Sequence, residues 1–160
     1  MLWQPYFERA GIPVELFGII LALTMVLSIF VPRYADRIAE RFKGAARTLM
    51  IVSITSALFI FMMYAIPKYS FIPYIIYTAV YSAHTPIFMS YFNKLIPSSE
   101  RATIISIYSL FISVSTILCT YSFGVLSDKK GLYAALFLSL ITALISSIPF
   151  KRAIGLEKEL

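Results

Sequence analysis

Five long apolar segments alternate with short polar stretches along the chain. They cover about residues 12–32, 45–66, 70–93, 103–123 and 131–150. Each has close to the roughly 20 apolar residues that a helix needs to cross the ~30 Å hydrocarbon layer of a bilayer. Prolines, glycines and charged residues gather mainly between the segments, where loops are expected. The pattern predicts an all-α, polytopic membrane helix bundle with five transmembrane helices.

The composition supports this class and excludes others. The chain is 59% hydrophobic and has a mean hydropathy of +0.82, whereas soluble domains are about 45–50% apolar. A net charge of +6 could indicate a nucleic-acid partner. The basic residues lie at the ends of the apolar segments rather than on one face, however, so no nucleic acid is expected. Cys119 is the only cysteine, which excludes an internal disulfide and a cysteine-based metal site.

The distribution of basic residues predicts the orientation. Residues 33–47 carry five of the fourteen Lys and Arg residues and separate two apolar segments. Short loops this rich in basic residues stay in the cytoplasm, because their translocation is unfavourable. Alternation then places ten Lys and Arg inside and four outside. The chain is therefore expected in the cell (plasma or inner) membrane, with its N-terminus outside and its C-terminus in the cytoplasm. A helical continuation of this loop would bring Asp36 and Glu40 within reach of arginines.

The most informative feature is an internal repeat at an offset of 92 residues. The matched residues are Pro5, Glu8, Arg9, Ala10 and Ile12 with Pro97, Glu100, Arg101, Ala102 and Ile104. The same offset pairs Asp36 with Asp128. Three predicted spans lie between matched positions, so the matched loops fall on opposite sides of the membrane. Such an inverted-topology repeat is a common build of secondary transporters.

The two repeat units are unequal. The second holds three predicted spans, whereas the first holds two, preceded only by the first seven residues. We therefore expect five helices of a six-helix half-domain that begins inside its first helix. On this interpretation residues 1–160 form a single domain that is truncated at its N-terminus.

Two short motifs resemble signatures of the major facilitator superfamily. The first fits the pattern G-x-L-x-D-[RK]-x-G and comprises Gly124, Leu126, Asp128, Lys129 and Gly131. The second is similar to the cytoplasmic loop signature of that family and keeps Ala35, Asp36, Arg37 and Arg41. Pro32 and Ala39 stand there in place of the usual glycines, and Tyr34 replaces a leucine. Residues 97–131 also resemble helices ten to twelve of drug-exporter-like members.

The resemblance covers the whole chain as the last five helices of this family, that is, the C-terminal portion of a transporter. It implies a secondary active transporter that moves a small molecule by alternating access, in an exporter-like manner. The missing N-terminal transporter half would be its partner, beside the lipid bilayer and the substrate. The resemblance also implies that spans 12–32, 70–93 and 103–123 face the substrate, and that spans 45–66 and 131–150 face lipid.

Two stripes are candidates for substrate contact. In the third span Tyr77, Tyr81 and His84 follow helical spacing, and no other histidine or charged residue lies as deep in a span. In the fourth span Ser109 and Ser113 belong to a stripe of hydroxyl residues. Both stripes can also serve helix packing, which is the commoner role of an aromatic stripe and for which small hydroxyl residues are favoured between membrane helices. Substrate contact and packing are therefore two open interpretations.

A second set of candidates lies in the polar stretches. Asp36, Arg37, Arg41 and Asp128 belong to the two motifs, and the resemblance implies that they help to hold one access state. The other interpretation of residues 33–47 is a solvated, positively charged loop.

No enzyme motif is present, since the chain lacks HExxH, GxSxG and a glycine-rich phosphate loop. We expect no catalytic residues, no metal site and no cofactor. The function that the sequence favours is secondary transport. The alternative is an autonomous five-span membrane scaffold, or a partner-binding subunit, without transport activity.

The orientation gives a first testable prediction. Reporter domains fused at Gly44 and after Leu160 should both be cytoplasmic, and a reporter fused at Lys68 should be external, because ten of the fourteen basic residues then lie inside. Alkaline phosphatase and green fluorescent protein fusions would measure this. An external Gly44 reporter would contradict every assignment of sides.

Overall fold

The computed structural model describes residues 3–156, and every regular element in this range is helical. The longer elements are α2 (Glu15–Phe30), α4 (Ala45–Ala65), α5 (Phe71–Ser82), α6 (His84–Leu95), α7 (Arg101–Lys130), α8 (Leu132–Ile145) and α9 (Ser147–Leu156). The shorter ones are α1 (Trp3–Arg9), α3 (Ala35–Arg41) and the 3-10 turns η1 (Val31–Tyr34) and η2 (Pro67–Tyr69). The predicted all-α membrane bundle is confirmed.

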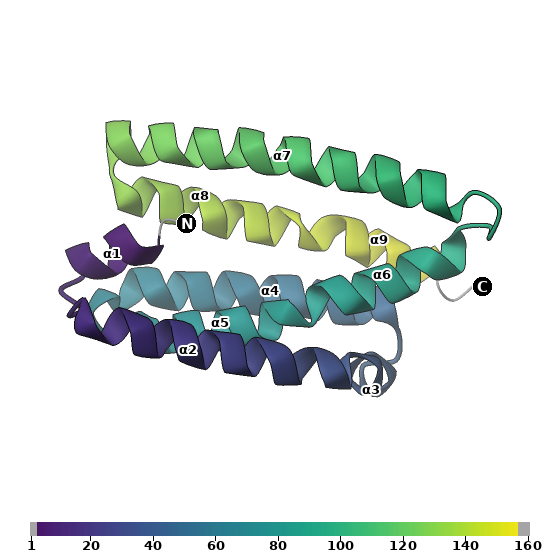
Figure 1. The fold of residues 1–160 in the computed structure, drawn as a ribbon, viewed down its shortest axis with the longest axis horizontal. Helices are drawn as coiled ribbons and strands as arrows, with labels where there is room; N and C mark the ends of the chain where they lie inside the picture. Colours follow the sequence, from purple (N-terminus) through teal and green to yellow (C-terminus); the bar gives the residue numbers. More distant parts are fainter. Residues whose placement is uncertain (1–2, 157–160) are drawn as a thin grey trace.

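The long helices run side by side along one axis (Figure 1). α2 and α7 form the two edges of the bundle, with the other long helices between them. α1, η2 and the α7–α8 turn lie at one end, whereas α3, the α6–α7 connection and the end of α9 lie at the other. The polar stretches that the sequence placed on opposite sides of a membrane are thus at opposite ends of the bundle.

Four helical stretches in the described residues are long and apolar enough to cross a membrane. They are Glu15–Arg41, Ala45–Ala65, Arg101–Lys130 and Leu132–Gly155. The expected span at residues 70–93 is instead divided into α5 and α6, with 12 residues each. One such helix is only about 18 Å long, but the two in succession cover the ~30 Å of a hydrocarbon core. The third expected span, residues 70–93, is therefore a helix broken into two parts.

The break between α5 and α6 has an identifiable cause. Pro86 has no backbone N–H, so the ladder of helical hydrogen bonds is interrupted one turn before it. At the break the Ala83 N–H contacts the Val80 carbonyl at 3.3 Å, and the normal pattern resumes with the Ile87 N–H on the Ala83 carbonyl. The Ser82 hydroxyl donates to the Ala79 carbonyl at 2.6 Å. Ala83 itself is only 2% exposed, so the irregular backbone is covered by protein.

α4 is the most deeply packed helix of the bundle. It contacts α5, α6, α8 and α9, and nine of its 21 residues are buried. Leu49 and Ala46 are fully buried, whereas Leu58 and Phe61 on the other side are about half exposed. The expectation that span 45–66 faces lipid is therefore wrong for its inner side. Hydropathy alone does not distinguish lipid from a packed neighbour, because both are apolar.

α7 is longer than the predicted span 103–123. It continues through Asp128, Lys129 and Lys130 and ends at Gly131, which has a φ of +85°. The Gly131 N–H donates to the Ser127 carbonyl at 2.8 Å, and lysines in a last turn favour the negative end of a helix dipole. Asp128, Lys129 and Lys130 therefore lie on the helix, and not in a loop between the expected spans 103–123 and 131–150.

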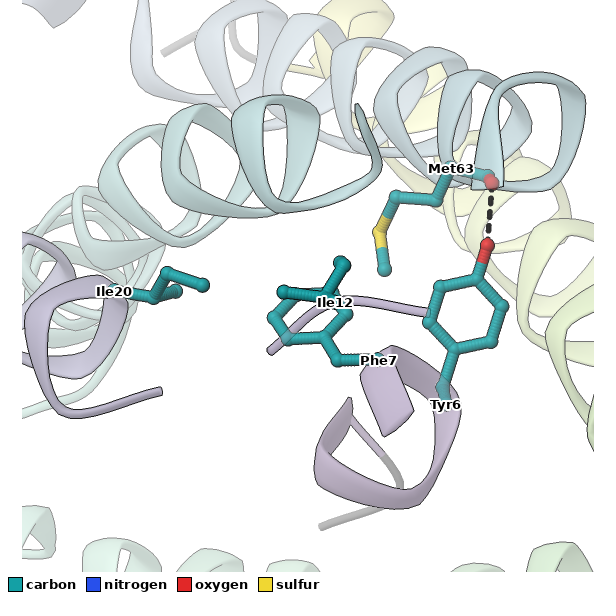
Figure 2. Close-up of a cluster of buried hydrophobic side chains, with 5 residues drawn as sticks. All are labelled: Tyr6, Phe7, Ile12, Ile20 and Met63. Atoms are coloured by element: carbon teal, nitrogen blue, oxygen red, sulfur yellow. Dashed lines mark hydrogen bonds between the residues drawn. The ribbon is translucent and has the colours of Figure 1, made fainter. Parts of the chain in front are cut away.

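Aromatic packing fastens α1 to the bundle. Phe7 is fully buried and Tyr6 is 3% exposed, and both pack with Ile12, Ile20 and Met63 (Figure 2). The Tyr6 hydroxyl donates to the Met63 carbonyl at 2.5 Å, one of the last four carbonyls of α4 that have no partner within their own helix. The Phe7 ring meets the Tyr74 ring edge-on at 5.2 Å. α1 is therefore held by both α4 and α5.

This packing predicts a stability difference within α1. Phe7→Ala should lower the free energy of unfolding by about 3–5 kcal/mol, because it leaves a cavity in a fully packed cluster. Gln4→Ala in the same helix should change it by less than about 0.5 kcal/mol, because Gln4 is exposed. Circular dichroism of denaturant unfolding in detergent measures both values. Equal losses would show that α1 is not packed as described.

Candidate functional site

A cavity of about 680 Å³ lies in the bundle between α1, α4, α5, α7 and α8. Its size falls within the range of about 300–1,000 Å³ that is typical of small-molecule sites. α1 contributes Trp3 and Tyr6 at one end, and α5 contributes Tyr74 and Tyr77 to the wall. The cavity thus lies among membrane-spanning helices, with α1 at one end.

The wall of the cavity is apolar and aromatic with a few hydroxyl groups. The hydroxyl residues are Thr78 of α5, Ser115, Thr116 and Thr120 of α7, and Ser139 of α8. No Asp, Glu, Lys or Arg among the described residues lines it. Such a wall accommodates apolar or aromatic groups and offers few hydrogen bonds, because unpaired charges are costly to bury there.

Small residues recur at four-residue spacing on two walls of the cavity. α7 presents Ser115 with Cys119, and Thr116 with Thr120 and Gly124; α8 presents Ala135 with Ser139. This spacing keeps small side chains on one helix face and lets another membrane helix approach closely. The cavity thus has the size of a ligand site, and its wall has the small side chains that are typical of helix packing in membranes.

Beside the cavity, aromatic rings form a stacked row along α5 and α6. Tyr77 and Tyr81 have ring centroids 5.8 Å apart, Tyr81 and His84 are 5.3 Å apart with planes at 11°, and His84 and Phe88 are 6.1 Å apart with planes at 5°. The row crosses the helix break without interruption. Tyr81 is 48% exposed, so part of this side chain remains accessible at the centre of the broken span, although Tyr77 and His84 stack with it.

The row reaches its neighbours at the α3 end of the bundle. Phe88 stacks on Tyr108 of α7 with centroids 5.4 Å apart, and His84 meets Phe150 of α9 at 6.1 Å. Aromatic rings thus join α6 and α7 at this end. The cavity lies between α5 and α7 nearer the α1 end, where Trp3 and Tyr6 line it. The structure brings together the three expected residues Tyr77, Tyr81 and His84, of which Tyr77 also lines the cavity.

Ser109 and Ser113 are not brought to the cavity. Both are exposed on α7, and the Ser113 hydroxyl donates to the Ser109 carbonyl at 2.9 Å. With roughly 100° per residue, Ser109 and Ser113 lie within about 20° of Thr116 and Thr120, respectively, two turns nearer the start of α7. The hydroxyl stripe, which also holds Thr116 and Thr120, therefore runs into the cavity wall, and only these two threonines line the cavity.

A second hollow lies at the α3 end, between α3, the start of α4 and the end of α6. Asp36, Glu40, Lys43 and Lys94 contribute to its lining. Arg37 and Arg41 are exposed on α3 but do not line it. Asp128, the fourth residue proposed to hold an access state, is exposed near the opposite end of the bundle. The helical continuation through α3 is confirmed, but among residues 3–156 its carboxylates form no ion pair with the arginines.

Several lining residues were not singled out from the sequence. Trp3 and Tyr6 belong to α1, which is too short and too polar for a hydropathy pattern to indicate its contacts. Ser115, Cys119 and Ser139 are inconspicuous in an apolar run. Their spacing of four on α7, and that of Ala135 and Ser139 on α8, was the available signal.

A protein-family profile matches the amino-acid sequence over nearly its whole length. The Major Facilitator Superfamily profile matches residues 1–157 of the chain. The chain belongs to the Major Facilitator Superfamily. Members of this family are transporters, and together with the four apolar helical stretches the match makes this a multi-pass membrane protein in contact with the bilayer. No curated protein and no solved structure matches the chain.

The cavity gives a test with a matched pair on α7. Cys119, the only cysteine, lines the cavity and reports its accessibility through its reaction with N-ethylmaleimide. Ser115→Phe should slow this reaction severalfold, because the ring fills the space beside Cys119. Val114→Phe places the same ring on the side of α7 opposite the cavity wall, because Val114 is 48% exposed and does not line the cavity, and it should leave the rate unchanged. A similar slowing in both variants would argue against the cavity face assigned to α7.

Proposed function

We propose that this chain is part of a secondary active transporter that moves a small molecule across the cell membrane by alternating access, in the direction of export. One observation carries the proposal: a ligand-sized cavity lies among the membrane helices of a member of a transporter family. A scaffold without transport activity would need no such cavity. On this proposal the chain catalyses no reaction, because transport requires only that the substrate binds and that the protein changes conformation.

The substrate path would run along the aromatic row. Tyr77, Tyr81 and His84 present ring faces near the middle of the broken span, the depth at which transporter sites occur. Aromatic faces bind apolar groups by stacking and cations through their quadrupoles. Ser109 and Ser113, which continue the α7 wall toward the start of that helix, would border the same path where another helix faces α7.

The internal repeat supports a proposal for the surface of residues 1–160 that contacts the rest of the transporter. The offset of 92 residues pairs α2 with α7, and α4 with α8 and α9, and leaves α5 and α6 without a counterpart. α5 packs against α2 and α4. A counterpart of α5 would therefore pack against α7 and α8, which are walls of the cavity. We propose that the N-terminal transporter half, with this counterpart helix, meets residues 1–160 there.

Alternating access needs contacts that differ between two states. Asp36 with Arg37 and Arg41, and Asp128 at the matched repeat position, lie near opposite ends of the bundle. We propose that each set holds the transporter closed on its own side. The α3 end would be cytoplasmic, with the N-terminus outside, as the distribution of basic residues favours.

Ethidium, a planar aromatic cation, tests the proposed path. Its binding to the purified chain in lipid nanodiscs can be followed by quenching of Trp3, the only tryptophan, which lines the cavity. Tyr81→Ala should weaken binding about two- to fivefold, since a cation over a partly exposed ring contributes roughly 0.5–1 kcal/mol. Phe61→Ala should have no effect, because Phe61 is 51% exposed on α4 and does not line the cavity.

The outcome distinguishes the two interpretations of the row. Equal affinities for wild type, Tyr81→Ala and Phe61→Ala would mean that the stacked rings are only a packing seam. Loss of binding in Tyr81→Ala with unchanged helicity would support a substrate surface.

A further inference from the structure

α3 carries a row of arginines that the transport path does not use. Arg37 and Arg41 are one turn apart on α3 and so share one side of this helix, and Arg33 precedes them in η1. All three are exposed. Three guanidinium groups on neighbouring turns form a concentrated positive surface, which is unfavourable unless anions lie near it.

The carboxylates of α3 line a different surface from these arginines. Asp36 and Glu40 line the hollow beside α6, where Lys43 and Lys94 also lie, and Arg33, Arg37 and Arg41 are outside that lining. Throughout residues 3–156 the arginines of α3 form no ion pair. Two of them instead lie over aromatic rings: Arg33 is 5.5 Å from the centre of the Phe30 ring, and Arg37 is 5.8 Å from that of Tyr34. Such stacking orients a guanidinium while its N–H donors remain available.

The position of α3 fits the surface of a bilayer. α3 is seen end-on in Figure 1, whereas the long helices run across the view, so it lies across the end of the bundle. It follows the apolar helix α2 directly, and Tyr34 and Phe42 at its two ends are 51% and 39% exposed. Tyrosine at this position is typical of the membrane interface, and a helix lying flat there places its basic side chains among headgroups.

We propose that the arginine row of η1 and α3, formed by Arg33, Arg37 and Arg41, binds the phosphate groups of anionic lipids in the adjacent leaflet. Guanidinium groups match phosphate oxygens with paired hydrogen bonds. Other exposed basic residues at this end, Lys43, Lys151 and Arg152, reinforce the same field. The role concerns lipid rather than substrate. Arg37 and Arg41 are also proposed to hold one access state, but the test below measures lipid binding alone and does not depend on transport.

Titration with short-chain lipids tests this inference. Detergent-solubilised chain is titrated in a calorimeter with dioctanoyl phosphatidylglycerol, with the zwitterionic dioctanoyl phosphatidylcholine, and with inorganic phosphate. Phosphatidylglycerol should bind and the other two should not. The variant R33Q/R37Q/R41Q should weaken its binding about 100-fold, given a loss of roughly fivefold for each basic residue at a membrane surface. R33K/R37K/R41K, which keeps the charge, should retain most of the binding.

A matched variant separates a local site from overall charge. K68Q/K129Q/K130Q removes the same charge from exposed lysines at the opposite end of the bundle and should bind phosphatidylglycerol as wild type does. An equal loss in both glutamine variants, or no loss in the arginine variant, would overturn the proposal. Equal binding of phosphatidylcholine or of inorganic phosphate would also overturn it, because the site would then not select anionic lipid.

Discussion

In the hydrocarbon of a membrane, each backbone N–H and C=O has to find its partner within the protein. This constraint explains why every regular element of residues 3–156 is a helix, and it decides where the chain can depart from a helix. The chain departs from a helix within two spans, at Ser146 between α8 and α9 and at Ala83 between α5 and α6. The break at Ala83 is the buried one. It is tolerated because Ala83 and Ile87 are buried against Leu49 and Ala35 in a single cluster, so the irregular backbone never meets lipid. α4 supplies this cover from its central position.

The break has a consequence for the side chains beside it. A continuous helix would carry Tyr77, Tyr81 and His84 along a slowly rotating stripe, with the row set by helix geometry alone. Here the row passes from α5 to α6 with nearly parallel planes at His84, although the backbone changes direction. The rings therefore stabilise the junction of the two short helices as well as forming a surface. Packing and substrate contact are compatible for such a row, because Tyr81 is 48% exposed although it stacks with both Tyr77 and His84.

The sequence predicts the fold class and the approximate position of the long apolar helices well, because hydropathy acts over whole segments. It predicts poorly which side of each helix packs against protein and which side faces lipid. α4 and α7 have similar apolar composition, yet nine residues of α4 are buried and none of α7 is. The difference comes from neighbours, which a single apolar pattern does not specify. The same limit explains why Tyr77 was found but Ser115 and Cys119 were not: aromatic residues stand out in a sequence, whereas small residues matter only when two faces approach.

The two ends of the bundle differ in kind as well as in charge. At the α1 end the chain is closed by a buried aromatic cluster around Phe7, which fixes α1 against α4 and α5. At the α3 end it is bordered by a short helix with exposed arginines over aromatic rings. A rigid apolar end and a charged end respond differently to their surroundings, since salt and lipid headgroups act on exposed charge and hardly on buried rings. If the loops at the two ends hold opposite access states, lipid composition would act on the α3 end, and so would bias one state over the other.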